Sequence, residues 1–238
     1  MTIHPRPLRC LPPLILASGS PRRRELLAEA GYDFTVVPPG EDVECGVCSE
    51  SGPAGLVAEL ALRKAAAVVQ QLQNDASAGR RAGSSATPVW RRPGSLPPSV
   101  LAADTLAECD GLVLGKPRNE DDARTMLKQL RGREHRVLTG VCLWPLASPI
   151  ADETNRGAKQ RERQPLVRVA VTRLRMDPLS DAQLDNYLAS GQWEGKAGAF
   201  GYQDRLGWVH VAEGSETNVV GLPMELLEQM LDEIARDC

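Results

Sequence analysis

The residues LILASGSPRRRELLAEA, positions 14–30, contain a short apolar run, a polar turn and an amphipathic segment in close succession. The apolar run Leu14–Ala17 predicts a buried strand. Ser20 and Pro21 favour a helix that begins directly after it. Serine is a common helix N-cap, and a proline at the first helical position gives up no intrahelical hydrogen bond. The stretch therefore predicts a strand, a tight polar turn and a helix.

Three arginines, Arg22, Arg23 and Arg24, follow the proline at the positive end of the predicted helix dipole. Each cation there costs about 0.3–1 kcal/mol, so an anion bound beside the free backbone N–H groups best explains the cluster. Leu26, Leu27 and Ala30 mark the core face of the helix. This phase directs Arg22 and Arg23 along the upper edge of the predicted sheet and Arg24 towards solvent. The alternative is a solvated basic turn.

Composition limits the class of protein. The chain has 238 residues, 42% of them hydrophobic, which is enough for one large domain or two small ones. A net charge of -3 and a pI near 5.7 argue against a polynucleotide partner, so any phosphate site must be local.

Met1–Pro13 mimics a signal peptide, but its apolar part is short and has no clean cleavage site. No segment is long enough to span a membrane. We expect a soluble, cytoplasmic protein.

The cysteines are scattered, and Cys45 and Cys48 are the only close pair. A structural zinc site needs a second pair, and His4, His135 and His210 are too dispersed in the sequence to supply one. The pair is therefore interpreted as small, reduced hydrophobic residues, with a redox or metal role as the minor alternative.

The rest of the chain alternates between strand and helix patterns. The patterns predict further strands at 34–37, 99–108, 112–116, 136–143, 166–176 and 208–212, and helices at 55–73, from Asn119 to Gly132, from Ser180 to Ser190 and after Pro223. Leu56, Leu60 and Ala67 form the apolar stripe of the helix at 55–73. The polar stretches 75–99 and 148–165 are interpreted as flexible surface insertions. The order predicts an α/β fold with a mixed sheet.

Asp104 is an acid inside the apolar strand segment Leu101–Leu106. Burying a charged aspartate costs on the order of several kcal/mol unless the carboxylate is paired, hydrogen-bonded or bound to a metal. Lys116 ends the returning strand of the predicted hairpin, so both groups can project towards one cleft. The alternative is a structural acid at the end of a strand.

The segment Lys196–Gln203, KAGAFGYQ, is rich in small residues that let a backbone approach a ligand closely. Gln203 offers both a donor and an acceptor. Asn218–Gly221, which precedes Pro223, is a weaker signal of the same kind.

Seven features occur in order along the chain: SGSPRR, Glu44, Lys64, AADT, GKP at 115–117, KAGAFGYQ and NVVGLP. Together they resemble the Maf family of nucleotide pyrophosphatases, which are related in fold to the inosine triphosphate pyrophosphatases. The resemblance implies a single domain over 1–238, with a mixed twisted sheet flanked by helices and a central cleft. It also implies hydrolysis of nucleoside triphosphates to monophosphate and pyrophosphate with a divalent metal, Mg²⁺ or Mn²⁺, and a homodimer.

The resemblance assigns a role to individual residues. Asp104 becomes the proton acceptor for the attacking water, and Glu44 joins it as a metal-side carboxylate, with Glu41 and Asp42 as competing positions. The expected substrate-binding residues are Ser18, Ser20, Arg22, Arg23, Lys64, Thr105, Lys116 and Gln203.

Three positions separate the branches of the family. Arg22, Thr105 and Gln203 resemble the branch that acts on dTTP and UTP, whereas the 7-methyl-GTP branch has Trp, Gln and Glu there. A glutamine amide satisfies the uracil edge, which presents a carbonyl and an N–H. We therefore expect a dTTP and UTP pyrophosphatase, with modified pyrimidine nucleotides as further substrates. The alternatives are a 7-methyl-GTP-type pyrophosphatase and a non-catalytic nucleotide-binding regulator of cell division. Serine hydrolase and P-loop motifs are absent from the sequence.

Overall fold

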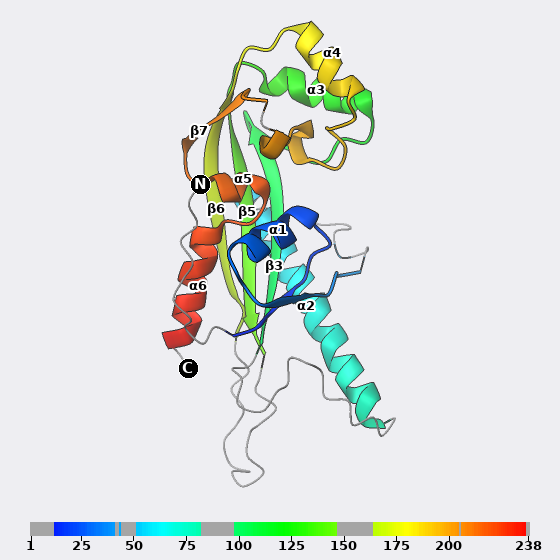
Figure 1. The fold of residues 1–238 in the computed structure, drawn as a ribbon, viewed down its shortest axis with the longest axis vertical. Coiled ribbons are helices and arrows are strands. Elements are labelled where there is room, and N and C mark those ends of the chain that lie inside the picture. The colour runs from blue at the N-terminus through cyan, green and yellow to red at the C-terminus, as the bar shows by residue number, and fades with distance from the viewer. Residues whose placement is uncertain are drawn as a thin grey trace.

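The computed structural model describes residues 12–40, 43, 51–81, 98–146, 164–204 and 206–236. A seven-stranded mixed sheet forms its centre (Figure 1). Six strands lie in the order β2 (Phe34–Val36), β1 (Leu14–Leu16), β3 (Ser99–Cys109), β5 (Glu134–Pro145), β6 (Leu166–Met176) and β7 (Val209–Glu213), and β4 (Leu112–Leu114) pairs with β3. The predicted α/β class with a mixed sheet is confirmed.

The sheet changes direction between β3 and β5. β1 runs parallel to both of its neighbours, and β3, β5, β6 and β7 are successively antiparallel. β1 is buried along its whole length because helices cover both faces of the sheet there. This explains why Leu14–Leu16 is a continuous apolar run rather than an alternating one.

Helices cover both faces of the lower part of the sheet. α1 (Pro21–Glu29) and α6 (Met224–Arg236) pack on one face, where Leu16, Leu27 and Leu227 belong to one core cluster. α2 (Gly52–Arg81) packs on the other face, against Ile15 and Val100. Figure 1 shows α6 and α2 on opposite sides of the long strands.

Two further helices, α3 (Glu120–Leu130) and α4 (Asp181–Ala189), lie together at the other end of the sheet (Figure 1). Their apolar faces enclose a separate core cluster around Leu127, Leu174 and Leu184. α4 begins with a capping box, since the Ser180 hydroxyl accepts from the Gln183 N–H and the Gln183 side chain accepts from the Ser180 N–H. The site described below lies between these two groups of helices.

α2 differs from its prediction in length and in phase. The helix continues to Arg81, so residues 75–81 extend it instead of opening an insertion. Its buried face is Val57, Ala61, Lys64, Ala65 and Val68, whereas the predicted stripe of Leu56, Leu60 and Ala67 is only partly buried. The stripe was wrong because α2 packs its small residues against the sheet, and this phase turns Leu56 and Leu60 towards a cleft.

The structure differs from the remaining predictions in a few short segments, and some predictions fall on residues that it does not describe. Two 3-10 turns in the described C-terminal part, Ala197–Ala199 and Tyr202–Asp204, and the short helix α5 (Glu216–Val220) lie where the patterns predicted no element. β4 ends at Leu114, so Lys116 follows the strand rather than ending it. The predictions for Cys45 and Cys48, and for most of the two polar stretches, fall on residues outside the described ranges.

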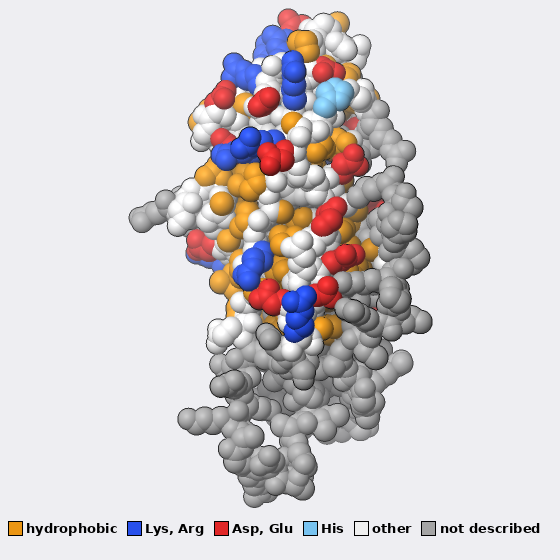
Figure 2. Space-filling model, turned by 90° about the vertical axis from the view of Figure 1, so that its left-hand side faces the viewer, with side chains coloured by type: hydrophobic (Ala, Val, Ile, Leu, Met, Phe, Trp, Pro, Cys, Tyr) orange, Lys and Arg blue, Asp and Glu red, His pale blue; other side chains and the backbone are white. Residues whose placement is uncertain are grey.

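The surface of the described residues is mixed in charge. Figure 2 shows Lys and Arg side chains interspersed with Asp and Glu on the face that includes α6 and β7. Ion pairs join the elements there, such as Arg168 with Glu233 at 3.4 Å and Arg173 with Glu213 at 3.5 Å. Within the described ranges, no helix is both long enough and apolar enough to cross a membrane.

Candidate active site

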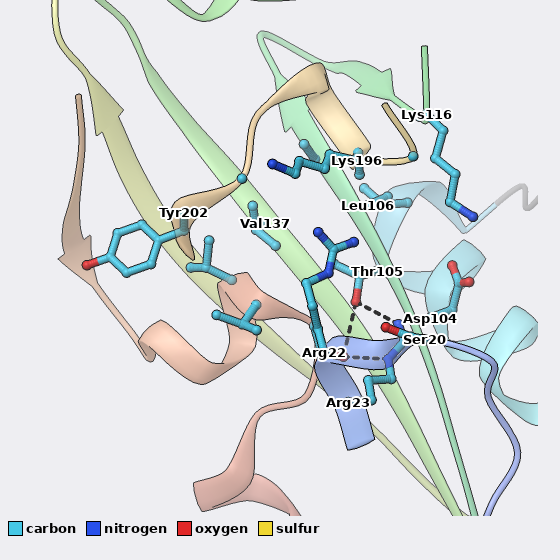
Figure 3. Close-up of a pocket in the computed structure, with 18 of the residues that line it drawn as sticks. Ser20, Arg22, Arg23, Asp104, Thr105, Leu106, Lys116, Val137, Lys196 and Tyr202 are labelled. Carbon is cyan, nitrogen blue, oxygen red and sulfur yellow. Dashed lines mark hydrogen bonds between the residues drawn. The ribbon is translucent and has the colours of Figure 1, made fainter. Parts of the chain in front are cut away.

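A cleft of about 710 Å³ lies between the two groups of helices (Figure 3). Its walls come from the start of α1, the α2 surface, β3, the connection after β4, the segment 195–202 and the turn at Gly221. Eight predicted site residues line it: Ser18, Ser20, Arg22, Arg23, Lys64, Asp104, Thr105 and Lys116. Glu44 and the side chain of Gln203 lie outside the described part of the chain.

Asp104 and Lys64 form the central ion pair of the cleft. The Lys64 Nζ donates to the Asp104 Oδ1 at 2.5 Å, and the two side chains are 7% and 14% exposed. Lys64 lies on the buried face of α2, so its ammonium reaches the cleft from within the packed helix. The pair satisfies the requirement that a buried aspartate be compensated, and it fixes the carboxylate at the wall of the cleft.

Arg23 connects three parts of the chain. Its Nε donates to the Gly221 carbonyl oxygen at 2.8 Å, its Nη1 to the Ser18 Oγ at 3.0 Å, and its Nη2 to the Thr105 Oγ1 at 3.2 Å. These bonds fix the start of α1 against β3 and against the turn before α6. Arg23 therefore holds the cleft together as well as lining it.

A hydroxyl network lies beneath Arg23. The Thr105 Oγ1 is 2.9 Å from the Thr139 Oγ1, and the Thr139 Oγ1 donates to the Asn218 carbonyl oxygen at 3.2 Å. The buried Asn218 amide donates to the Val137 carbonyl and to the Thr172 Oγ1. The weak NVVG signal in the sequence thus has a structural explanation, because this turn anchors the arginine and threonine side of the cleft.

Arg22 and Lys116 are the uncommitted cations of the cleft. Among the described residues, neither forms an ion pair or a side-chain hydrogen bond, and Lys116 is exposed. Figure 3 shows the Arg22 side chain extending into the cleft from α1 and Lys116 entering from the connection after β4. Guanidinium and ammonium groups in this state are available to bind phosphate oxygens.

The turn before α1 only partly follows the prediction. Ser20 is the N-cap residue and Pro21 is at the start of the helix, but the Ser20 side chain forms no capping hydrogen bond. The Ser20 N–H instead donates to the Ser18 Oγ at 3.2 Å, which tightens the turn. The N-terminus of α1 therefore faces the cleft without a side-chain cap, which suits an anion.

Three polar side chains of the cleft had no role in the sequence-based prediction: His135, Lys196 and Tyr202. His135 is a buried residue of β5, and burial lowers the pKa of its imidazole. Lys196 and Tyr202 belong to the KAGAFGYQ segment, which was singled out only for its small residues and for Gln203. A lysine at the start of that segment was the available signal, whereas nothing local distinguished His135.

The described donors fit a metal that is bound mainly by substrate. Within the ranges that the structure describes, no group of three or more His, Cys, Asp or Glu side chains could hold an ion. Asp104 nevertheless places one hard oxygen donor beside the cations of the cleft. Mg²⁺ is commonly held by one or two carboxylates together with substrate phosphates, so this donor set suits it.

A mixed-sheet fold whose cleft combines free cations with one paired carboxylate is typical of an α/β protein that binds phosphate esters. A family model described as "Maf-like protein" matches residues 13–234, and the chain belongs to this family.

Curated relatives cover almost the whole chain. A protein of Rhodopirellula baltica named "dTTP/UTP pyrophosphatase" is 46% identical over 92% of this chain and 81% of its own length. A protein of Symbiobacterium thermophilum with the same name is 40% identical over 92% of both chains. Among solved structures, a HAM1 protein from Coxiella burnetii is 14% identical, with a TM-score of 0.42 over 94% of this chain and 98% of that one.

Proposed function

We propose that this protein is a nucleoside triphosphate pyrophosphatase that hydrolyses dTTP and UTP to the monophosphate and pyrophosphate. The observation that carries the proposal is the Asp104 carboxylate, held by Lys64 at 2.5 Å in a cleft that also contains the uncommitted Arg22 and Lys116. The names of the relatives that share most of the chain support the same activity.

The reaction needs a base and a binding site for negative charge. Asp104 accepts a proton from the attacking water, whose oxygen forms a bond to the α-phosphorus. The bond from that phosphorus to the bridging oxygen breaks, and pyrophosphate leaves with the electron pair. Lys64 keeps the carboxylate in one orientation, and Arg22 and Lys116 bind the phosphate oxygens. Positioning and charge stabilisation supply most of the rate in such reactions.

A divalent cation, Mg²⁺ or Mn²⁺, belongs to the proposal. Asp104 would hold it together with Glu44 and the phosphate oxygens. When bound, it would neutralise charge on the triphosphate. The residues of this chain would still bind the nucleotide and accept the proton.

The preference for uracil and thymine follows from the positions that separate the branches. Arg22 and Thr105 line the cleft, and Gln203 lies in the segment that forms one of its walls. A glutamine amide pairs with a carbonyl and an N–H on the same edge of a base, whereas a cationic methylated guanine favours a carboxylate. We therefore place the chain in the pyrimidine branch, with modified pyrimidine nucleotides included.

The proposal also covers the binding partners, the localisation and the oligomeric state of the protein. The interspersed charges of Figure 2 and the net charge of -3 support a small nucleotide as the partner rather than a nucleic acid polymer. We propose a cytoplasmic enzyme that forms a homodimer and does not bind membranes.

The decisive experiment is a substrate panel. The purified protein is assayed for pyrophosphate release from UTP, dTTP, CTP, GTP and 7-methyl-GTP, each with Mg²⁺, with Mn²⁺ and with a chelator. Highest kcat/KM on UTP and dTTP, with activity only in the presence of metal, supports the proposal. Preference for 7-methyl-GTP supports the other branch. Nucleotide binding without pyrophosphate release indicates a regulator.

A further inference from the structure

The segment 196–204 forms one wall of the cleft and is closed on itself by an ion pair. The Lys196 Nζ donates to both oxygens of Asp204, at 2.5 and 2.6 Å. The two side chains are 13% and 10% exposed, so the pair is largely desolvated. The Tyr187 hydroxyl of α4 donates to the Asp204 Oδ2 at 2.9 Å. We call Lys196, Asp204 and Tyr187 the clasp.

Two glycines, Gly198 and Gly201, allow the backbone of residues 196–204 to pack closely around the Lys196–Asp204 ion pair. A Cβ on Gly201 would lie 2.6 Å from the Lys196 Nζ and 2.9 Å from the Asp204 Oδ1. Gly198 has a φ of +68°, and its N–H donates to the Gly115 carbonyl at 3.0 Å. The wall is thereby attached to the connection that carries Lys116, one of the two uncommitted cations.

The far side of the segment is held as well. The Tyr202 hydroxyl donates to the Glu216 Oε1 of α5 at 2.9 Å. The Phe200 ring packs against Tyr187, with ring centroids 5.6 Å apart, and stacks on Trp208 at 6.2 Å. Residue 203 thus lies between two neighbours whose side chains are both hydrogen-bonded to other parts of the chain.

The two ends of the cleft differ in chemistry. Asp104, Lys64 and Arg22 line one end. At the other end the clasped segment packs through Phe200 on a core cluster whose members also line the cleft, namely Ala107, Leu130, Val137, Leu174 and Val209. A triphosphate is placed by charge at the first end, so the base must lie against the second. This step depends on the proposed function.

Lys196 is a cation at the apolar end, and Asp204 compensates it. An unpaired ammonium there would be costly to bury, would attract an anion, and would donate to the O2 carbonyl that uracil and cytosine share. We propose that Asp204 is a positioning residue for base selection. It neutralises Lys196 and fixes the segment 196–204, so that this wall presents a rigid, uncharged surface to a pyrimidine.

The test compares Asp204→Asn with two other variants. Asp181→Asn is the matched control, because Asp181 pairs with Arg131 at 2.5 Å but is 72% exposed and far along α4 from the cleft wall. Tyr187→Phe removes a single hydrogen bond of the clasp and leaves the charges in place, so it serves even if Asp204→Asn folds poorly. Steady-state kinetics with UTP and CTP and hydrogen exchange of residues 196–204 are measured for each.

We expect Asp204→Asn to reduce the UTP over CTP ratio of kcat/KM about tenfold, through KM, with kcat for UTP within about threefold of wild type. Tyr187→Phe should reduce the ratio about twofold, and exchange at 196–204 should increase in both variants. Asp181→Asn should match wild type. An unchanged ratio in a variant with faster exchange, or a loss confined to kcat, overturns the inference.

A binding measurement separates this inference from the proposed function. Dissociation constants for non-hydrolysable UTP and CTP analogues are determined by calorimetry for the same proteins. In one outcome, wild type releases no pyrophosphate and still prefers the UTP analogue, and that preference is lost in Asp204→Asn. This result would support the role of Asp204 in base selection and contradict the proposed enzymatic function. Equal affinity of the wild-type protein for the two analogues would contradict the proposed role of Asp204 in base selection.

Discussion

Gly140 of β5 lies directly against the Val57 carbonyl of α2. A Cβ at Gly140 would be 2.2 Å from the Val57 oxygen and 2.8 Å from the Ala58 nitrogen, so only glycine permits this approach. Gly140 is also the register partner of Asp104 on β3. The close approach of α2 at this point brings Lys64, two turns further along the helix, to the Asp104 carboxylate.

Gly140→Ala should therefore disturb both stability and the active site. Overpacking against backbone costs about 1–3 kcal/mol, and the displaced α2 carries Lys64 away from Asp104. Urea unfolding and kcat measured well below the midpoint check the two effects. Gly40→Ala is the control, because a Cβ there has no atom within 4 Å. Equal stability of the two variants would contradict the packing argument.

Asp104→Asn should retain nucleotide binding and lose turnover. Loss of a general base lowers kcat about 10²- to 10⁴-fold, and the neutral amide still accepts a hydrogen bond from Lys64. Kinetics of pyrophosphate release and binding of a non-hydrolysable UTP analogue give the two readouts. Asp110→Asn, in the exposed turn of the same hairpin, should behave as wild type. A fully active Asp104→Asn enzyme would remove Asp104 from the proposed role.

Arg22→Ala should weaken substrate binding without affecting the fold. A charge-assisted hydrogen bond contributes roughly 1.5–3 kcal/mol, so the KM for UTP should increase about 10- to 100-fold. Arg24→Ala is matched in chemistry and lies two residues further along α1, where the side chain is exposed and outside the cleft. Equal KM values for the two variants would mean that Arg22 does not contact substrate.

Arg23→Ala should instead reduce stability. The substitution removes three hydrogen bonds and leaves the Gly221 carbonyl and the Thr105 hydroxyl with fewer donors. We expect a loss of about 1.5–3 kcal/mol in the free energy of unfolding, measured by urea titration. Arg22→Ala, whose side chain has no such partners among the described residues, should lose less than about 0.5 kcal/mol. The opposite ranking would show that Arg23 is not the structural member of the pair.

His135 should make stability depend on pH. Burial lowers the pKa of the folded imidazole below its usual 6.5, and the nearby backbone of Arg133 opposes the shift. Below pH 6.5 the unfolded chain binds a proton that the folded chain excludes, so stability falls as the pH decreases and is fully present above 6.5.

His135→Phe should flatten this dependence. The variant keeps a planar ring but cannot titrate, so its free energy of unfolding should fall less than that of wild type between pH 7.5 and 5.5, by up to about 1.4 kcal/mol per pH unit. Urea titrations at the two pH values give the slopes. Parallel slopes would show that the pKa of His135 is the same in the folded and unfolded chains.

The sequence by itself determined the local elements and the type of chemistry. The run Leu14–Leu16, Pro21 at the start of α1 and the capping box of Ser180 and Gln183 each depend on residues close in sequence, and all three occur in the structure. The apolar pattern, the geometry of proline and helix capping depend only on residues close in sequence, so they can be predicted before the tertiary structure is known. An aspartate inside an apolar strand likewise indicated a compensated charge before its partner was known.

Only the tertiary structure decided which groups meet. Lys64 and Asp104 are 40 residues apart, and Arg23 and Gly221 are 198 residues apart. The buried face of α2 depends on the close approach at Gly140, which no periodicity within the helix records. The Lys196 and Asp204 pair required the fold of a glycine-rich loop around two side chains. Contacts between distant segments are set by sheet register and by the packing of backbone on backbone, which a local pattern does not encode.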